Sequence, residues 1–377
     1  MGEGPIAVDA ERASGFTFSQ RAYLIQIYRR GAEVFLFDPP AIGSFQELAA
    51  VISDQEWILH AASQDLACLR EVGLDPNRIF DTELAARLLG FPRVGLGTVV
   101  EELLGIHLAK EHSAADWSTR PLPATWLEYA ALDVELLVDV RDRMVELLDE
   151  QKKTDIAAQE FEATRLKEPK AAPAEPWRKL NGVSSIRNAQ GQAVARELWR
   201  ARDALGRESD TAPGRLVPDA SIVAAAQAMP ASKRELAALR TFSGRASRTE
   251  LDRWWTAVDG GRTTDDLPIT RRSEDTLPPV RSWAERNPGA DLRLKLSRAA
   301  LQVVSEEHAI PLENLLTPEF LRRLAWNPPQ PVDAHSIAVG LQNLGARPWQ
   351  VELTAQEIAH SFVEAGQEVA KSSEEES

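Results

Sequence analysis

The sequence predicts a mixed α/β domain whose sheet begins with three antiparallel strands, followed by segments that are entirely helical. Three observations lead to this prediction. Strand-like runs follow one another over residues 6–38, strand and helix patterns alternate from there to about residue 150, and helical periodicity alone continues from residue 177. A chain of 377 residues is also too long for one ordinary core, so two or three domains are expected.

The first three strand-like runs are IAVDAE, YLIQIYRR and GAEVFLFDP, and the turns between them predict an antiparallel meander. WILHA (57–61) indicates a fourth strand, and a helix is expected from Ser63. IFDTELAARLLG (79–90) is typical of a strand end that leads into a helix stopped by Gly90. Further helices are predicted over 98–105 and 124–150, and together these elements form a mixed α/β pattern.

Composition shifts divide the chain. The α/β domain is predicted over 1–155, and a linker rich in Pro, Lys, Glu and Ala over 156–176. A helical domain (177–259), a second polar linker (260–279) and another helical domain (280–366) follow. Residues 367–377 form an acidic tail that is expected to be disordered.

Composition excludes several classes of protein. Cys68 is the sole cysteine, so an internal disulfide or a cysteine-based zinc site is excluded. No apolar run approaches the roughly 18–20 residues that span a membrane, and a signal-peptide pattern is missing, so a cytoplasmic protein without a membrane partner is expected.

The net charge of −14 is uneven: residues 1–150 carry −13 and residues 151–260 carry +5. An acidic domain argues against nucleic acid as a partner unless that domain recruits divalent cations. The basic middle segment is the part suited to phosphates.

Five residues of the first domain predict a metal-dependent site. Asp9 and Glu11 end the first strand on one face, and Asp65 follows WILHA at the start of a helix. Tyr129 and Asp133 share a helix face because they are four residues apart. Carboxylate oxygens are the ligands of hard divalent cations, and phosphodiester hydrolysis commonly uses two such ions. We therefore predict two ions, Mg²⁺ or Mn²⁺, and no organic cofactor.

Each of these residues taken alone has a simpler explanation. A D-x-E pair after a strand is common, Asp65 could be a favourable acid at a helix N-terminus, and Tyr129 and Asp133 could be a partly buried tyrosine and a solvated acid. The prediction depends on all five residues standing in order, each on a suitable element.

The same residues resemble a known family. Asp9-Ala10-Glu11, then His60 to Asp65 (HAASQD), then Tyr129 to Asp133 (YAALD) are similar to the three motifs of DEDDy 3′–5′ exonucleases. IFDTELAARLLG, DWSTRPLP (116–123) and LEYAALDV (127–134) narrow the resemblance to ribonuclease D. PWRKLNGVSSIRNAQGQAVARELWRARDALGRE and AAAQAMPASKRELAAL resemble an HRDC domain, with 280–366 as a second, HRDC-like domain.

The resemblance implies an RNase H-like exonuclease fold and trimming of RNA 3′ ends, notably of tRNA precursors. A monomer is expected. It assigns metal-ligand roles to Asp9, Glu11, Asp65 and Asp133 and the orientation of the attacking water to Tyr129. Ala10 and Arg12 stand where the family often has Thr and Phe. Members also carry a segment before the first strand, so the sequence is expected to begin late, through truncation or a misplaced start. Action on DNA 3′ ends and a non-catalytic RNA-binding scaffold remain alternatives.

Substrate contacts are predicted at further residues. Ala10 would contribute its backbone and Arg12 would approach a phosphate, while His60 would either contact substrate at the rim or simply end the strand. Trp117 and Arg120 would stack on a base and pair with a phosphate, or else anchor their loop. Lys110 is another phosphate candidate.

The middle segment has its own basic group. Arg187, Arg196, Arg200 and Arg202 are expected along one long helix, with Arg178 and Lys179 before it. These residues form either an auxiliary RNA contact or an ordinary solvated face. Trp199, Trp254 and Trp255 are predicted to lie in the core.

Overall fold

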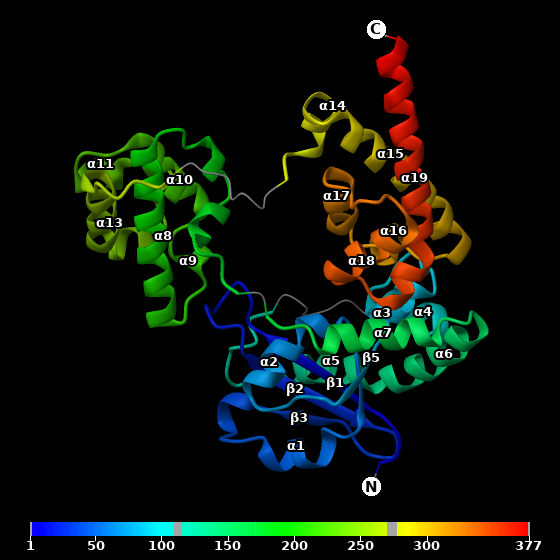
Figure 1. The fold of residues 1–377 in the computed structure, drawn as a ribbon. Coiled ribbons are helices and arrows are strands. Elements are labelled where there is room, and N and C mark those ends of the chain that lie inside the picture. The colour runs from blue at the N-terminus through cyan, green and yellow to red at the C-terminus, as the bar shows by residue number, and fades with distance from the viewer. Residues whose placement is uncertain (1, 109–114, 170, 270–276, 376–377) are drawn as a thin grey trace.

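The computed structural model describes residues 2–108, 115–169, 171–269 and 277–375, with side chains up to residue 371. Figure 1 shows a sheet-containing domain at the N-terminal end of the chain, a helical domain drawn in green, and a C-terminal helical domain in yellow to red. In the described part of the chain, none of the helices combines the length and apolar character that crossing a membrane requires.

The sheet of the first domain has five strands in the order β3-β2-β1-β4-β5. β1, β2 and β3 pair antiparallel, whereas β4 and β5 continue the sheet in parallel from β1. The prediction of a mixed sheet with three antiparallel strands first is therefore confirmed. The strands are β1 (Ile6–Arg12), β2 (Ala22–Arg29), β3 (Phe35–Phe37), β4 (Glu56–Leu59) and β5 (Arg78–Asp81).

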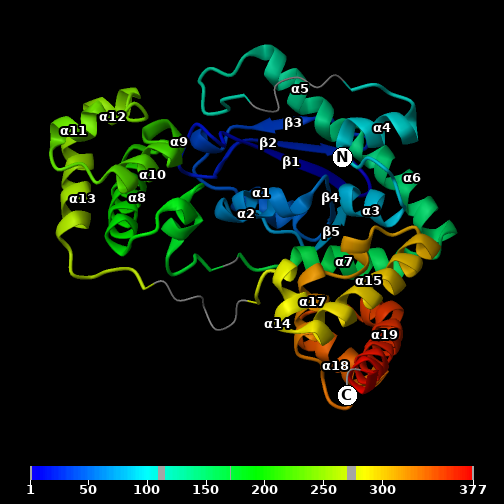
Figure 2. The same ribbon diagram turned by 90° about the horizontal axis from the view of Figure 1, so that it is seen from above.

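Helices cover this sheet, and α5 lies along β1 and β2 (Figure 2). The stretch expected as one long helix over 124–150 is two helices, α5 and α6, which meet at Leu136. The segment expected to be helical from Ser63 begins as a 3₁₀ turn, Ala62–Gln64, and α2 starts only at Leu66. The helices are α1 (Gln46–Ile52), α2 (Leu66–Glu71), α3 (Thr82–Leu88), α4 (Leu96–Leu104), α5 (Ala124–Glu135), α6 (Leu137–Glu150) and α7 (Thr154–Arg165).

Helix α7 corrects the first predicted linker, which was placed over 156–176. Its residues Ala157 and Phe161 are buried, and the Phe161 ring packs 4.8 Å from that of Phe80 on β5. Apolar residues at helical spacing therefore extend the first domain to Arg165. The predicted boundary was drawn too early because the polar residues of α7 resemble the Lys/Glu-rich stretch that follows.

The middle helical domain has its own hydrophobic core, which includes the buried Trp254, with Trp199 and Trp255 packed against it as predicted. It contacts the β1–β2 loop of the first domain: the Asp210 carboxylate accepts hydrogen bonds from the Ser19 backbone N–H and hydroxyl. Its helices are α8 (Ala189–Ser209), α9 (Pro213–Leu216), α10 (Asp219–Ala228), α11 (Lys233–Ala238), α12 (Arg245–Thr249) and α13 (Leu251–Thr263).

The C-terminal helices share one continuous core with the first domain. The Glu160 carboxylate of α7 accepts hydrogen bonds from Arg347 and, at 2.8 Å, from the Trp349 indole N–H. The helices are α14 (Trp283–Arg286), α15 (Pro288–His308), α16 (Leu312–Leu315), α17 (Pro318–Trp326), α18 (Ala334–Asn343) and α19 (Pro348–Glu375).

The last helix contradicts the expected disorder of residues 367–377, because α19 continues through Glu375. No proline interrupts the sequence after Pro348, and the residues beyond Gly366 include good helix formers such as Glu, Ala and Lys, so the helix already started can propagate.

Candidate active site

Three carboxylates lie close together beyond the point where β1 stops pairing with its parallel neighbour β4. β1 pairs with β4 only through Ile6 and Ala7, so the sheet opens beyond these residues, toward Asp9 and Glu11. Helix α5 packs against β1 and contributes Asp133. One oxygen from each of Asp9, Glu11 and Asp133 lies within 4.8 Å of the others. Three partly buried carboxylates at this spacing form a set that fits a hard divalent cation.

Burial and mutual repulsion disfavour the charged forms of this cluster. Burial, followed by the charges of Asp9, Asp133 and Asp65, raises the pKa of Glu11 to about 9. Burial and the charge of Asp9 raise the pKa of Asp133 to about 7, and burial raises that of Asp9 as well. A bound divalent cation would reverse these shifts, since it favours the ionised carboxylates.

Tyr129 lies one helical turn before Asp133 and shares a side-chain hydrogen bond with it. Burial and the charges of Asp133 and Glu11 raise the pKa of the phenol above its usual range. A phenol that holds its proton this firmly can donate a hydrogen bond but is a poor general base. This chemistry fits the orientation of a water molecule rather than its deprotonation.

Asp65 lies beside the three-carboxylate group. Its side chain is 7% exposed, and Arg12 Nη2 lies 3.4 Å from its Oδ1. Burial raises the pKa of Asp65 well above its usual value, the nearby charge of Asp9 raises it further, and Arg12 opposes both effects. The structure thus brings all five predicted residues into one region, with Asp65 engaged by a guanidinium.

Asp81 is a buried residue of this region to which the sequence analysis assigned no role. Its carboxylate caps helix α3 by accepting from the backbone N–H groups of Glu83 and Leu84. It also accepts from the N–H groups of Ala61, at 3.1 Å, and Ala62, at 2.9 Å, in the turn that leads to Asp65. Ala61 is held there in a left-handed conformation, with φ of 62°.

Asp81 therefore fixes the backbone of the turn within the second motif, His60 to Asp65. An aspartate between a strand end and a helix start, as in IFDTEL, was the available sequence signal. That signal predicts a helix cap but does not predict the link to residues 61 and 62.

His60 fits the second of its two interpretations, a histidine that ends the strand. Its Nδ1 lies 2.9 Å from the Thr82 hydroxyl, which itself donates to the Leu59 carbonyl. Burial lowers the pKa of His60 to about 4, so the ring is neutral at neutral pH. Ala10 is buried, and its backbone N–H bonds to the Asp9 carboxylate, while its contact with substrate stays a prediction.

Trp117 and Arg120 fit the second of their two interpretations, the anchoring of their loop. Trp117 is fully buried and packs edge-on against Trp126, so its faces are closed to a base. The Arg120 guanidinium binds the Asp38 carboxylate and the backbone carbonyls of Tyr23 and Trp117, so it anchors its loop. Lys110 lies outside the described residues.

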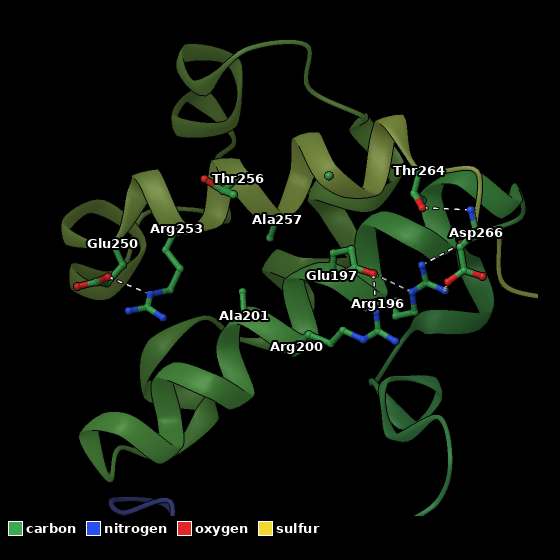
Figure 3. A pocket seen from close by; sticks show the side chains of 11 residues that line it. Arg196, Glu197, Arg200, Ala201, Glu250, Arg253, Thr256, Ala257, Thr264 and Asp266 are labelled. Atoms are coloured by element: carbon green, nitrogen blue, oxygen red, sulfur yellow. Dashed lines mark hydrogen bonds and ion pairs between the residues drawn. The ribbon is translucent and has the colours of Figure 1, made fainter.

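Most arginines of the predicted basic helix face are paired with carboxylates, and two of them are buried. Arg196 is buried and binds Glu197 and Asp266, while Arg200 binds Glu197 (Figure 3). Arg202 is also buried and donates to the Val217 carbonyl and the Asp219 carboxylate. The prediction that Arg196 contacts RNA is therefore wrong.

Arg187 differs from these arginines. It precedes α8 and is exposed, and its role in RNA contact stays a prediction. Spacing along a helix could not show that the carboxylates which neutralise the other arginines lie on α8 itself and on distant segments.

The fold and the acidic cluster together define a nuclease of the 3′–5′ exonuclease class, and comparison with family models agrees. Residues 2–149 match a 3′–5′ exonuclease model, 191–258 an HRDC domain, and 276–362 a 3′ to 5′ exonuclease C-terminal domain. The last segment thus matches a model other than that of the HRDC domain, and its description as a second HRDC-like domain stays a prediction.

Whole-chain relatives name the family. Ribonuclease D of Escherichia coli K12 is 30% identical, covering 85% of this chain and 84% of that protein, and ribonuclease D of Cronobacter turicensis is 30% identical, covering 85% of each. The chain belongs to the ribonuclease D family of 3′–5′ exoribonucleases.

Solved structures show the same architecture over 96% of the chain. A protein from Bifidobacterium adolescentis has a TM-score of 0.88 and 35% identity, and the match covers 96% of this chain and 92% of that one. E. coli RNase D, described as an exoribonuclease involved in structured RNA processing, has a TM-score of 0.68 and 26% identity, covering 96% and 93%.

Proposed function

We propose that this chain trims RNA 3′ ends, those of tRNA precursors among them, by divalent-metal-dependent hydrolysis that releases nucleoside 5′-monophosphates. The observation that carries the proposal is the group of three carboxylates within 4.8 Å, with Tyr129 bonded to one of them. RNA as the substrate is supported by the relatives named ribonuclease D, because the chain matches most of the length of each.

The four acids divide into two kinds of position, which supports a two-cation site. Oxygens of Asp9, Glu11 and Asp133 lie within 4.8 Å of one another, whereas Asp65 is outside this group but near enough to Asp9 for the charge of Asp9 to raise its pKa. Asp9 would contribute to both positions, Glu11 and Asp133 to the first, and Asp65 to the second. Two bound cations, Mg²⁺ or Mn²⁺, would activate a water molecule and stabilise the leaving oxygen.

The residues of the chain supply orientation. Tyr129 keeps its proton and orients the attacking water through its hydroxyl oxygen, and Asp81 holds the turn that presents Asp65. Water adds to the terminal phosphorus while the bond from phosphorus to the 3′ oxygen of the preceding nucleotide breaks. That oxygen takes up a proton, which leaves a 3′ hydroxyl on the shortened RNA and a free 5′-monophosphate.

The test uses 5′-labelled single-stranded RNA and a DNA of matched sequence with Mg²⁺, Mn²⁺ or EDTA. We expect a ladder that shortens from the 3′ end of the RNA, with monophosphate products and no cleavage in EDTA. Asp133→Asn should abolish the ladder, whereas Asp139→Asn, a surface residue paired with Arg30, should retain it.

Three results would change the assignment. Equal shortening of DNA would indicate an exonuclease without sugar preference. An inactive wild-type protein that still binds RNA would indicate a scaffold. A tRNA precursor that keeps its 3′ trailer under conditions in which the single-stranded RNA is degraded would remove tRNA precursors from the substrates.

A further inference from the structure

Arg12 is the cation that the described residues bring to the acidic cluster. Its Nη2 lies 3.4 Å from Asp65 Oδ1, and its side chain is 25% exposed against 7% for Asp65. The positive charge of Arg12 also opposes the rise in the pKa of Asp9 and Glu11. Arg12 therefore contacts an acid that a second divalent cation would use, while 25% of its own side chain stays exposed.

The local backbone directs Arg12 toward this place. β1 and β2 pair in regular register from Ile6 to Glu11, but Arg12 pairs with Ala22 rather than Tyr23, so β2 carries one extra residue there. Such bulges increase the local twist and re-aim side chains, and they are common next to active sites.

The loop that follows Arg12 is held by the HRDC domain. The Ala212 N–H donates to the Phe16 carbonyl at 3.0 Å, and Arg215 Nε donates to the Gly15 carbonyl at 2.8 Å. The backbone around Arg12 is therefore fixed on both sides, by the sheet before it and by this anchored loop after it.

The chemistry of a guanidinium limits what Arg12 can do. A guanidinium is a permanent cation in proteins, so loss of charge is no route by which an arginine leaves a carboxylate. A divalent cation that binds Asp65 competes for the same oxygen and repels Arg12. The planar fork of an arginine also matches a phosphate as well as it matches a carboxylate. A displaced Arg12 would thus find its new partner in a phosphate of the bound RNA.

We propose that Arg12 changes partner during substrate binding: it pairs with Asp65 in the free protein and with a phosphate of the RNA 3′ end once a divalent cation has bound Asp65. This inference rests on the proposed function, because it takes the cation and the RNA from it. Arg12 is then both a competitor of the second cation and a contact to the substrate, and cation binding and RNA binding are coupled through it.

The first measurement is Mn²⁺ binding to the RNA-free protein by calorimetry, for wild type, Arg12→Gln and Arg12→Lys. Removal of a competing cation should tighten Mn²⁺ binding in Arg12→Gln by about threefold, the size expected for loss of a partly exposed ion pair. Arg12→Lys keeps the charge and should bind Mn²⁺ like the wild type. Arg30→Gln, which removes an arginine paired with Asp139 and Asp142 on the surface, is the matched control.

The second measurement is the affinity for a single-stranded RNA with a non-cleavable 3′ linkage, with Mn²⁺ and in EDTA. Mn²⁺ should strengthen RNA binding less in Arg12→Gln than in the wild type. With Mn²⁺ present, the slope of log K for RNA against log salt should be shallower in Arg12→Gln than in the wild type by about 0.7. This is the contribution of one phosphate contact to binding of a single strand. In EDTA the two proteins should have the same slope, because Asp65 then holds Arg12.

The outcomes separate the two proposals. A wild-type protein that binds no Mn²⁺ contradicts the proposed function itself. A wild type that binds Mn²⁺, together with an Arg12→Gln variant of equal Mn²⁺ affinity and equal salt slope, overturns the inference on Arg12 alone. Circular dichroism of each variant checks the fold, and Arg12→Lys supplies the comparison if Arg12→Gln is unstable.

Discussion

Charged side chains gather in two regions of this molecule, and the regions treat them in opposite ways. In the groove between α8 and α13, Arg196, Arg200 and Arg253 each bind a carboxylate from the same domain (Figure 3). At the end of β1, carboxylates face other carboxylates, and burial and repulsion raise their pKa values. Compensated charges contribute to the structure of the helical domain. The carboxylate cluster destabilises the domain that holds it even with Arg12 beside Asp65, and a divalent cation bound there would relieve the repulsion.

The largest effect is expected where one acid of the cluster is neutralised. Glu11→Gln should reduce the rate of RNA shortening at least about 100-fold, since even changes to groups that only support metal ligands typically cost 10–100-fold. The same change should raise the melting temperature in EDTA, because the folded protein must hold a proton on Glu11, whose pKa is raised to about 9, whereas a glutamine is neutral without one. Activity assays and thermal melts in EDTA test both parts. A variant that is inactive but less stable than the wild type would contradict our account of the cluster.

A smaller effect is expected on the pH dependence of stability. The pKa of Glu11 is raised to about 9 and that of Asp133 to about 7, so in the metal-free protein the folded state holds protons that the unfolded state releases. Stability in EDTA should therefore fall as pH rises from 6 to 9. Cation binding requires the ionised acids, so the melting shift produced by Mg²⁺ should grow over the same range. Melts at three pH values with and without Mg²⁺ measure this, and a shift independent of pH would contradict it.

The sequence predicted the acidic region better than the basic one, for a physical reason. Asp9, Glu11, Tyr129 and Asp133 lie at strand and helix spacings that constrain their faces, and their element types were correct. The partners of Arg196, Arg202 and Arg120 include residues 15–82 positions away, and periodicity carries no information about such pairs. Asp81 was missed for the same reason, because its bonds to Ala61 and Ala62 cross twenty residues.

Helix α7 was predicted as part of a linker for a different reason, which is a buried charge on its packed face. Its buried Glu160 pairs with Arg347, so a charged residue occupies a position where the pattern for a packed helix requires an apolar one.

The smallest effects should come from the arginines of the helical domain, and they separate buried from exposed pairs. Arg202→Ala should lower the free energy of unfolding of this domain by about 2 kcal/mol, because it removes a buried donor to the Val217 carbonyl and to Oδ1 of Asp219. The Arg200 side chain is 58% exposed, so Arg200→Ala should change the free energy of unfolding by less than about 0.5 kcal/mol.

RNA affinity should change less than about twofold in Arg200→Ala, because Glu197 already neutralises that charge. Urea denaturation and RNA titration measure these quantities. A large loss of RNA affinity in Arg200→Ala with unchanged stability would mean that this arginine exchanges Glu197 for a phosphate, and the two regions would then be alike in binding a partner through their charges.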